Sequence, residues 1–170
     1  MNALDSGSTA ITDTFVVTSA DGNTQATITV TISGANDAPT ISSTAVLTAT
    51  EDAAYTYTVT AADVDSGETL TMTGTTVPGW ATFTASTGVL AGTPLNADVG
   101  DNSVVITVSD GTASVTDTFT IAVSNTNDAP TITSSAVLTA TEDSAYTYTV
   151  TAADADSDTL TMTGTTVPGW

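Results

Sequence analysis

Apolar and polar residues alternate with a period of two along much of this chain, which is the pattern of half-buried β-strands. Residues 55–61 alternate Tyr, Tyr, Val and Ala with threonine, and residues 118–123 alternate threonine or alanine with Phe, Ile and Val. Turn residues separate these runs, as in Asp110-Gly111. The pattern predicts seven strands, near residues 40–48, 54–62, 69–75, 80–84, 88–92, 103–109 and 113–123. Seven short strands in this length predict an all-β, immunoglobulin-like antiparallel sandwich.

A long internal repeat organises the chain. The sequence Asn36-Asp37-Ala38-Pro39 recurs at residues 127–130, and residues 41–80 return at residues 132–170 with few changes and one deletion. This period is too long for a solenoid repeat and has the size of one small domain. We therefore expect tandem domains: the C-terminal part of one repeat (1–35), a complete repeat (36–126) and the N-terminal half of another (127–170).

The two end segments have too few strands to close a sandwich by themselves. The chain is therefore expected to be a piece of a longer protein. The middle repeat is predicted to be well ordered, because segments near 40 residues rarely fold alone. The two end segments are predicted to be marginally ordered, or to pair with each other or with a second chain through their open strand edges.

The charge composition excludes several classes of function. The 170 residues include 19 Asp and Glu but no Lys, Arg, His or Cys, which gives a formal charge of −19. Catalytic triads, thiol chemistry, zinc ligand sets and phosphate clamps all need the missing residue types. Nucleic acid is not an expected partner of a polyanion, and no apolar run is long enough to insert into a membrane.

The acidic residues gather at the two poles of the predicted sandwich, because successive loops alternate between its ends. Two joins between domains are expected to collect carboxylates and linker amides. The first join would contain Asp13, Asn36, Asp37, Asp63, Asp65 and Asp110. The second would contain Glu51, Asp101, Asn125, Asn127, Asp128, Asp154, Asp156 and Asp158. Convergent carboxylates repel one another, and this chain has no cationic side chain to neutralise them, so we expect a metal ion from solution. An irregular, all-oxygen ligand set favours Ca²⁺.

Three other functions are compatible in principle with an acidic sandwich. Asp63 and Asp65 lie two residues apart in one loop and are poorly placed to flank a glycosidic bond from opposite faces, so no enzyme activity is expected. Exposed Tyr55, Tyr57 or Trp80 would make a carbohydrate-binding module, although Trp80 is expected to be the large core aromatic. A metal-free acidic spacer is the remaining alternative.

Several motifs together resemble a known family. Residues 36–170 are similar to dystroglycan-type cadherin-like and bacterial Ig-like tandem repeats, and residues 12–39 resemble the end of a VCBS-type repeat. The motifs that support the resemblance are Asn36-Asp37-Ala38-Pro39, Glu51-Asp52, Asp63-Val64-Asp65, Val77-Pro78-Gly79-Trp80, the segment GVLAGTP at 88–94 and Val108-Ser109-Asp110-Gly111. Such repeats are typical of large surface adhesins and RTX-like exported proteins of Gram-negative bacteria.

The resemblance implies an extracellular, cell-surface, calcium-binding module associated with adhesion. Its partners would be neighbouring repeats of the same chain and cell-surface glycans or proteins. Residues 125–129, Glu51 and the pair Asp154 and Asp156 fall on the positions that bind calcium in cadherins. Asn125 and Ala129 depart from the cadherin linker, and the cadherin motif that contains arginine is missing. The resemblance therefore implies one or two ions at each join.

Overall fold

The computed structural model describes residues 9–164, and almost all of its regular structure is β. Outside the strands, the described residues contain one short 3-10 helix, η1 (Asn96–Asp98). The first strands are β1 (Ile11–Thr18), β2 (Gln25–Ile32), β3 (Thr40–Ile41), β4 (Thr48–Thr50), β5 (Tyr55–Thr58) and β6 (Ala61–Ala62). The rest are β7 (Thr71–Thr76), β8 (Ala81–Thr84), β9 (Val89–Gly92), β10 (Gly100–Ser109), β11 (Ser114–Ser124), β12 (Thr131–Ile132) and β13 (Ala152–Ala153).

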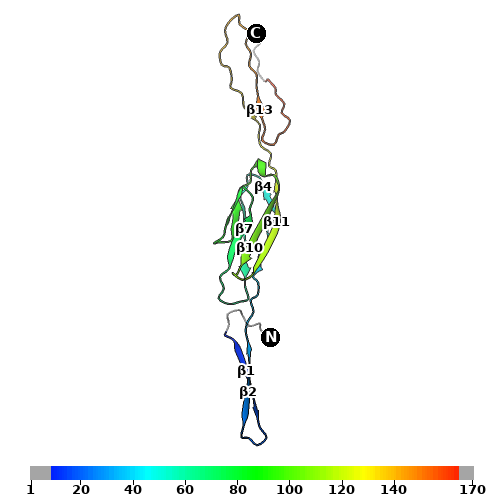
Figure 1. The fold of residues 1–170 in the computed structure, drawn as a ribbon. Helices are drawn as coiled ribbons and strands as arrows, with labels where there is room; N and C mark the ends of the chain where they lie inside the picture. The colour runs from blue at the N-terminus through cyan, green and yellow to red at the C-terminus, as the bar shows by residue number, and fades with distance from the viewer. Residues whose placement is uncertain (1–8, 165–170) are drawn as a thin grey trace.

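Strands β3 to β11 form a sandwich in the middle of the chain (Figure 1). One sheet has the strand order β4-β11-β10-β7, and the facing strands are ordered β5-β9-β8, with β3 and β6 forming a separate pair. All pairs are antiparallel except β4, which lies parallel to β11. The predicted all-β, immunoglobulin-like sandwich is therefore confirmed.

Two of the seven predicted strands are interrupted. The strand expected at 54–62 divides into β5, which pairs with β9, and β6, which pairs with β3. The strand expected at 40–48 divides into β3 and β4, and β4 pairs with β11. Side chains hold the segment between them: the Tyr55 hydroxyl donates to the Val46 carbonyl (2.8 Å), and the Ser43 and Tyr57 hydroxyls are 2.9 Å apart. Alternation alone could not reveal this change of sheet, because both halves retain a strand-like pattern.

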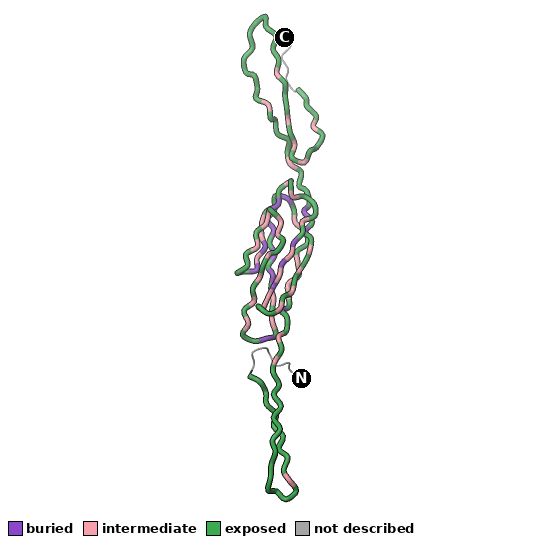
Figure 2. Tube along the Cα trace, in the orientation of Figure 1, coloured by how far each residue is buried: buried purple, intermediate pink, exposed green. Residues whose placement is uncertain are grey.

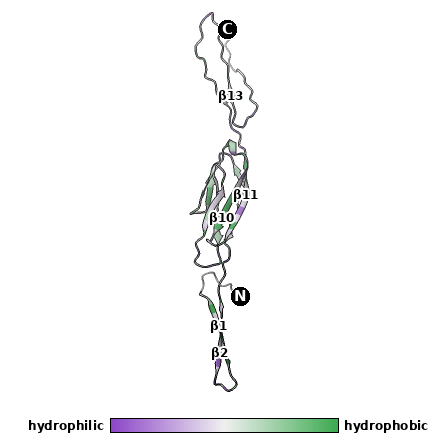
Figure 3. Cartoon of the chain, in the orientation of Figure 1, coloured by the Kyte–Doolittle hydropathy of each residue, from purple (hydrophilic) through white to green (hydrophobic). Residues whose placement is uncertain are grey.

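The hydrophobic core lies between the two sheets of this middle unit. Every buried residue in the described part of the chain falls between Pro39 and Val123, and Figure 2 shows the same concentration of buried positions. The core consists of Tyr55, Tyr57, Val59, Leu90, Val104, Ile106, Val108, Ile121 and Val123. Figure 3 shows hydrophobic segments on strands of the middle unit and on the β1–β2 hairpin, with a hydrophilic segment on β11.

Simpler structures lie on either side of the middle unit. Strands β1 and β2 form an antiparallel hairpin at one end, and β12 and β13 pair within a looped segment at the other (Figure 1). The second Val-Pro-Gly-Trp motif, at 167–170, lies outside the described residues. No helix among the described residues is long and apolar enough to cross a membrane.

Candidate metal centre

A cluster of oxygen ligands lies where the linker enters the middle unit. We call it the lower cluster; it comprises Asn36, Asp37, Asp63, Asp65, Glu68 and Asp110. Three parts of the chain converge here. Residues 36–37 come from the linker, residues 63–68 from the loop between β6 and β7, and Asp110 from the turn between β10 and β11. The sandwich topology places these two loops at the same pole.

Hydrogen bonds lock the linker onto this pole. The Asp37 amide donates to Asp65 Oδ2 (2.7 Å), and the Asn36 side-chain amide donates to Asp110 Oδ2 (3.1 Å). The Asp65 amide donates to Asp63 Oδ1 (2.8 Å), which folds the acidic loop back on itself. Asp65 is only 4% exposed, so this carboxylate belongs to the interior. The linker is thus positioned by acidic side chains.

Three carboxylates of the lower cluster point toward a common centre. One oxygen each from Asp63, Glu68 and Asp110 lies within 4.8 Å of the other two. No lysine, arginine or histidine exists in the chain to offset this charge. A group of like charges at such distances is unfavourable unless a cation lies among them.

Two buried side-chain oxygens of the lower cluster are also suited to bind a cation. Asn36 Oδ1 and Asp63 Oδ2 are buried and accept no hydrogen bond within the described residues. The orientation of the Asn36 amide is fixed, because its nitrogen donates both to the Asp37 carbonyl (2.7 Å) and to Asp110. A buried acceptor without a donor is destabilising, whereas a cation would satisfy both oxygens.

Hydrogen bonds stabilise the ionised form of Asp110. The amide of Ala113, assisted by that of Thr112, donates to its Oδ1 at 2.6 Å and holds the pKa of this carboxyl below its usual value. The Asn36 side chain adds to this effect. Asp110 Oδ2 faces the linker, so one oxygen shapes the turn and the other remains available to the cluster.

The other end of the middle unit carries a related arrangement. We call it the upper cluster; it comprises Asp154, Asp156 and Asp158, whose carboxylate oxygens lie within 4.8 Å of one another. The Asp128 amide donates to Asp156 Oδ2 (2.5 Å), and the Asp156 amide donates to Asp154 Oδ1 (2.9 Å). These bonds repeat those of Asp37, Asp65 and Asp63 in the lower cluster.

Glu51 anchors the outgoing linker. This side chain is only 2% exposed, and its Oε2 accepts a hydrogen bond from the Thr126 amide (3.1 Å). The Thr126 hydroxyl donates to the Glu51 carbonyl (3.3 Å). Asn127 donates its side-chain amide to the Asp128 carbonyl (2.8 Å), as Asn36 does to Asp37. The buried Glu51 therefore fixes the start of the outgoing linker through two hydrogen bonds with Thr126.

Three of the predicted ligands lie apart from both clusters. Asp13 lies within β1 opposite Val30. Asp101 lies within β10 rather than in a loop, and its side chain is exposed. Asn125 is an exposed linker residue. None of the three belongs to a group of carboxylates that the structure brings together.

Two contributors were not among the predicted ligands. Glu68 joins Asp63 and Asp110, and its counterpart in the repeat is Asp158, which follows a loop shorter by one residue. Asn96, in η1, donates its side-chain amide to Asp156 Oδ1 (2.9 Å) and so links the middle unit to the next repeat. Aligning the two copies at the deletion would have pointed to Glu68. No sequence signal pointed to Asn96.

The three aromatic residues considered for a carbohydrate-binding surface lie in the core or against it. Tyr55 and Tyr57 are 5% and 4% exposed. Trp80 packs against the core, edge-on to Tyr55, and its Nε1 donates to Asn102 (3.0 Å), as expected for the core aromatic. The burial of both tyrosines agrees with the predicted apolar face of this strand and does not support the alternative of a carbohydrate-binding module.

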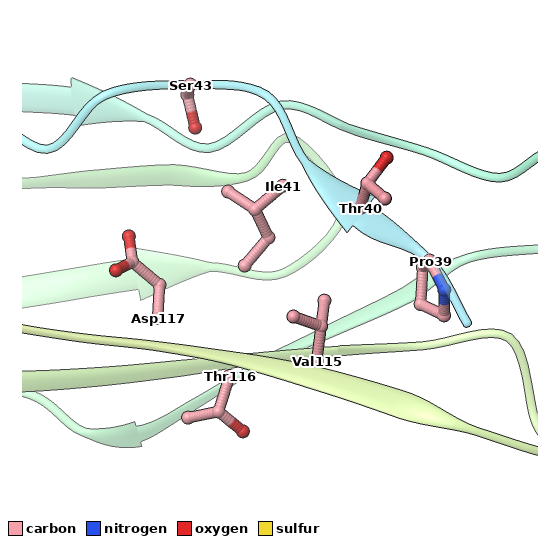
Figure 4. Close-up of a pocket in the computed structure, with 7 residues that line it drawn as sticks. All are labelled: Pro39, Thr40, Ile41, Ser43, Val115, Thr116 and Asp117. Carbon is pink, nitrogen blue, oxygen red and sulfur yellow. The ribbon is translucent and has the colours of Figure 1, made fainter.

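A shallow groove beside β3 and β11 also lacks a stacking surface. It has a volume of about 370 Å³ and contains no aromatic ring among its lining residues (Figure 4). Its single carboxylate, Asp117, lies in the first half of β11 and is not part of the lower cluster. The groove does not gather polar groups around a common point.

The fold agrees with the comparison to known families. A family model described as Putative Ig domain matches residues 38–124, about half of the chain, and the chain belongs to this family. The match falls within the repeat predicted at 36–126, and the second copy extends the same sequence beyond it. No curated protein matches the chain.

Solved structures similar to the chain include endo-fucoidan hydrolases of glycoside hydrolase family 107. MfFcnA4 is 32% identical over 68% of this chain and 18% of its own, with a TM-score of 0.44. MfFcnA9 is 24% identical over 68% of this chain and 22% of its own, with a TM-score of 0.36. The chain thus spans about a fifth of the length of these enzymes.

Proposed function

We propose that this chain is a non-catalytic structural array of Ig-like repeats whose joins are stiffened by Ca²⁺. One observation carries the proposal. In the lower cluster, buried and unsatisfied oxygens of Asn36 and Asp63 adjoin three convergent carboxylates, in a chain without basic side chains. These residues suit a hard cation, because every available ligand is oxygen.

The identity of the cation follows from the shape of the ligand set. The ligands come from a linker, a long loop and a β-turn, and they include an amide as well as carboxylates. Ca²⁺ accepts six to eight oxygens in flexible geometry, whereas Mg²⁺ demands a strict octahedron and keeps its waters. The upper cluster, with Asp154, Asp156 and Asp158, would supply a second site of similar chemistry.

The mechanical effect of the ion is to hold a linker against a domain. Asp37 and Asp128 already donate their backbone amides to the acidic loops, so the linkers follow the ligand sets closely. Neutralising the carboxylates removes the repulsion that would otherwise loosen these contacts. The loaded array would behave as a rod, and the metal-free array as a flexible string.

Location and partners follow as parts of the same proposal. Extracellular modules bind Ca²⁺ with dissociation constants of about 10⁻⁴–10⁻³ M, far above the calcium concentration of a cytosol. A module of this kind would be loose before export and rigid outside the cell. Its primary partners would be neighbouring repeats, and it would serve as the stalk of an adhesion protein at the cell surface.

Calorimetry and small-angle X-ray scattering on the full chain test the proposal. After dialysis against EDTA, CaCl₂ should give saturable uptake and MgCl₂ a much weaker signal. The radius of gyration should rise with millimolar Ca²⁺. NaCl at matched ionic strength is the control, because screening of the −19 charge would by itself compact the chain. Absence of calcium uptake together with superimposable scattering curves would refute the proposal.

A further inference from the structure

A side-chain contact outside the linker joins the middle unit to the next repeat. Asn96, in η1, donates its side-chain amide to Asp156 Oδ1 (2.9 Å), and this contact is partly buried. Two further bonds hold the linker itself: the Thr126 amide donates to Glu51, and the Asp128 amide donates to Asp156 Oδ2. The middle unit and the next repeat are therefore attached to each other at two separate places.

A single crossing chain does not fix the orientation of two domains. One strand of chain passes between the middle unit and the looped segment beyond it (Figure 1). Glu51 holds this linker on one side of the join and Asp156 holds it on the other, so the backbone of Asn127 is the pivot between the two anchors. Rotation about the two soft dihedral angles of a residue there would swing the next repeat. A second attachment, made from another element, removes this freedom.

The element that carries Asn96 is held firmly on the middle unit. Asp98 closes η1, because its Oδ2 accepts the Leu95 amide (2.9 Å) and its own amide donates to the Leu95 carbonyl (2.8 Å). Pro94, directly before this turn, is fully buried, and its carbonyl accepts the Asp52 amide (2.9 Å). The Asn96 side chain is therefore presented from a fixed position.

A second side-chain amide connects η1 to the hydrophobic core. Asn102 donates its amide to the Asp98 carbonyl (2.8 Å), and its Oδ1 accepts the indole N–H of Trp80 (3.0 Å). Trp80 packs edge-on against the buried Tyr55, with ring centroids 5.6 Å apart. A continuous set of contacts therefore runs from the core of the middle unit through η1 to the next repeat.

Asp156 receives the two attachments on different oxygens. Its Oδ1 accepts from Asn96, and its Oδ2 accepts from the Asp128 amide (2.5 Å). An ionised carboxylate accepts at both oxygens, and hydrogen bonds to a charged group are about twice as strong as those between neutral groups. Asp156 also belongs to the upper cluster, so a cation bound there would keep this carboxylate in place.

We propose that Asn96 is a positioning residue, which fixes the orientation of the next repeat by binding its acidic loop at Asp156. The linker determines which repeats are neighbours, and Asn96 determines the angle at which they meet. Both groups in this contact belong to the protein, so the inference rests on the proposed function only where calcium is expected to tighten the join. Loss of the contact leaves both units folded and the join free to rotate.

Double electron–electron resonance on the full chain measures the spread of distances across the join. The chain contains no cysteine, so Thr120→Cys and Thr149→Cys provide two sites for spin labels and no others. Both threonines are exposed, one on β11 and the other in the next repeat. The labelled chain is compared with the same chain carrying Asn96→Ala. Leu95→Ala, at the exposed neighbouring position, is the matched control.

The decisive measurements are made in EDTA. The native chain should give one narrow distance peak, which Asn96→Ala broadens and Leu95→Ala does not. Asn96→Asp should broaden the peak at least as much, because two carboxylates then face each other. Adding Asp156→Asn to that variant should restore the narrow peak, since the introduced amide donates to the introduced carboxylate while its oxygen still accepts from Asp128. A role confined to the folding of η1 would not respond to this exchange.

The calcium dependence separates this inference from the proposed function. The native peak should narrow further in millimolar CaCl₂, and a peak that does not respond to calcium counts against the calcium-stiffened joins. The comparison in EDTA decides the inference whatever calcium does. Equal widths for the native chain and Asn96→Ala would overturn it, and so would a double variant, Asn96→Asp with Asp156→Asn, that stays as broad as Asn96→Asp alone.

Discussion

Replacing Asp63 by Asn should change the stability of the middle unit in opposite directions with and without calcium. The substitution removes one charge from a group of three carboxylates whose oxygens lie within 4.8 Å of one another. It also weakens a ligand whose Oδ2 is buried and accepts no hydrogen bond from the described residues. Metal-free protein should gain from the first effect, and calcium-loaded protein should lose from the second.

The magnitudes follow from the distance. Two unit charges 4.8 Å apart repel by about 0.9 kcal/mol at the dielectric of water and about 3.5 kcal/mol at an effective dielectric of 20. Asp63 and Glu68 are both partly exposed, so we expect a gain of about 1 kcal/mol in EDTA. Calcium at a hundredfold excess over its dissociation constant stabilises the native unit by about 2.7 kcal/mol. Most of that increment should disappear in the variant.

Thermal or urea unfolding in EDTA and in calcium measures both effects when it is followed by tryptophan fluorescence in a Trp170→Phe background, in which Trp80 is the one remaining tryptophan. The native chain should be less stable than the Asp63→Asn variant in EDTA and more stable than it in calcium. The melting temperature should change by about 4–8 °C for each kcal/mol. Asp117→Asn is the charge-matched control, since Asp117 lies in the groove beside β3 and not in the lower cluster. If Asp63→Asn changes the stability by the same amount as Asp117→Asn, both in EDTA and in calcium, the lower cluster does not bind calcium.

Three further results are expected. Leu90→Ala should lower the free energy of unfolding by about 2–5 kcal/mol because Leu90 is fully buried, while Leu95→Ala, at a 58% exposed position, should be nearly neutral in urea titrations. Gly88 has a left-handed φ of +69°, which costs a residue with a Cβ roughly 1–2 kcal/mol, and a Cβ there would lie 2.5 Å from a backbone oxygen. Gly88→Ala should therefore lower the free energy of unfolding by more than this amount, as measured by urea unfolding. Burial raises the pKa of Tyr55 to about 12, above the ordinary value of 10.0, so the folded chain retains this proton where the unfolded chain loses it. The free energy of unfolding should therefore fall between pH 10 and 12, and Tyr55→Phe should remove that fall.

The sandwich could be predicted because its signals are local and redundant. Threonine alternates with apolar residues in β5 and β11, and turns containing Gly or Asp separate the strands. The interruption between β3 and β4 could not be predicted, because it depends on tyrosine hydroxyls reaching back from another strand. Contacts of that kind have no period in the sequence.

The location of the candidate site could be predicted better than the residues that form it. Loop alternation brought the linker, the acidic loop and Asp110 to one pole, where the structure also gathers them. The predicted ligands also included Asp13 and Asp101, which lie in strands, and they omitted Glu68, although it follows Asp63 in the same acidic loop. Polarity of a loop indicates which end it occupies, but side-chain direction depends on the conformation within the loop.

The two copies of the repeat separate what sequence determines locally from what the complete domain adds. Tyr55 and Tyr146 stand in nearly identical sequences and donate the same hydroxyl hydrogen bond over the same separation of nine residues. Their exposures nevertheless differ, at 5% and 38%, because Tyr55 faces the β10–β11 pair, whereas no such pair faces Tyr146 among the described residues. Local conformation is thus encoded within some forty residues, whereas burial requires strands that come later in the chain, as β10 and β11 do in the middle unit. The stability of the middle unit therefore resides in that second, long-range step.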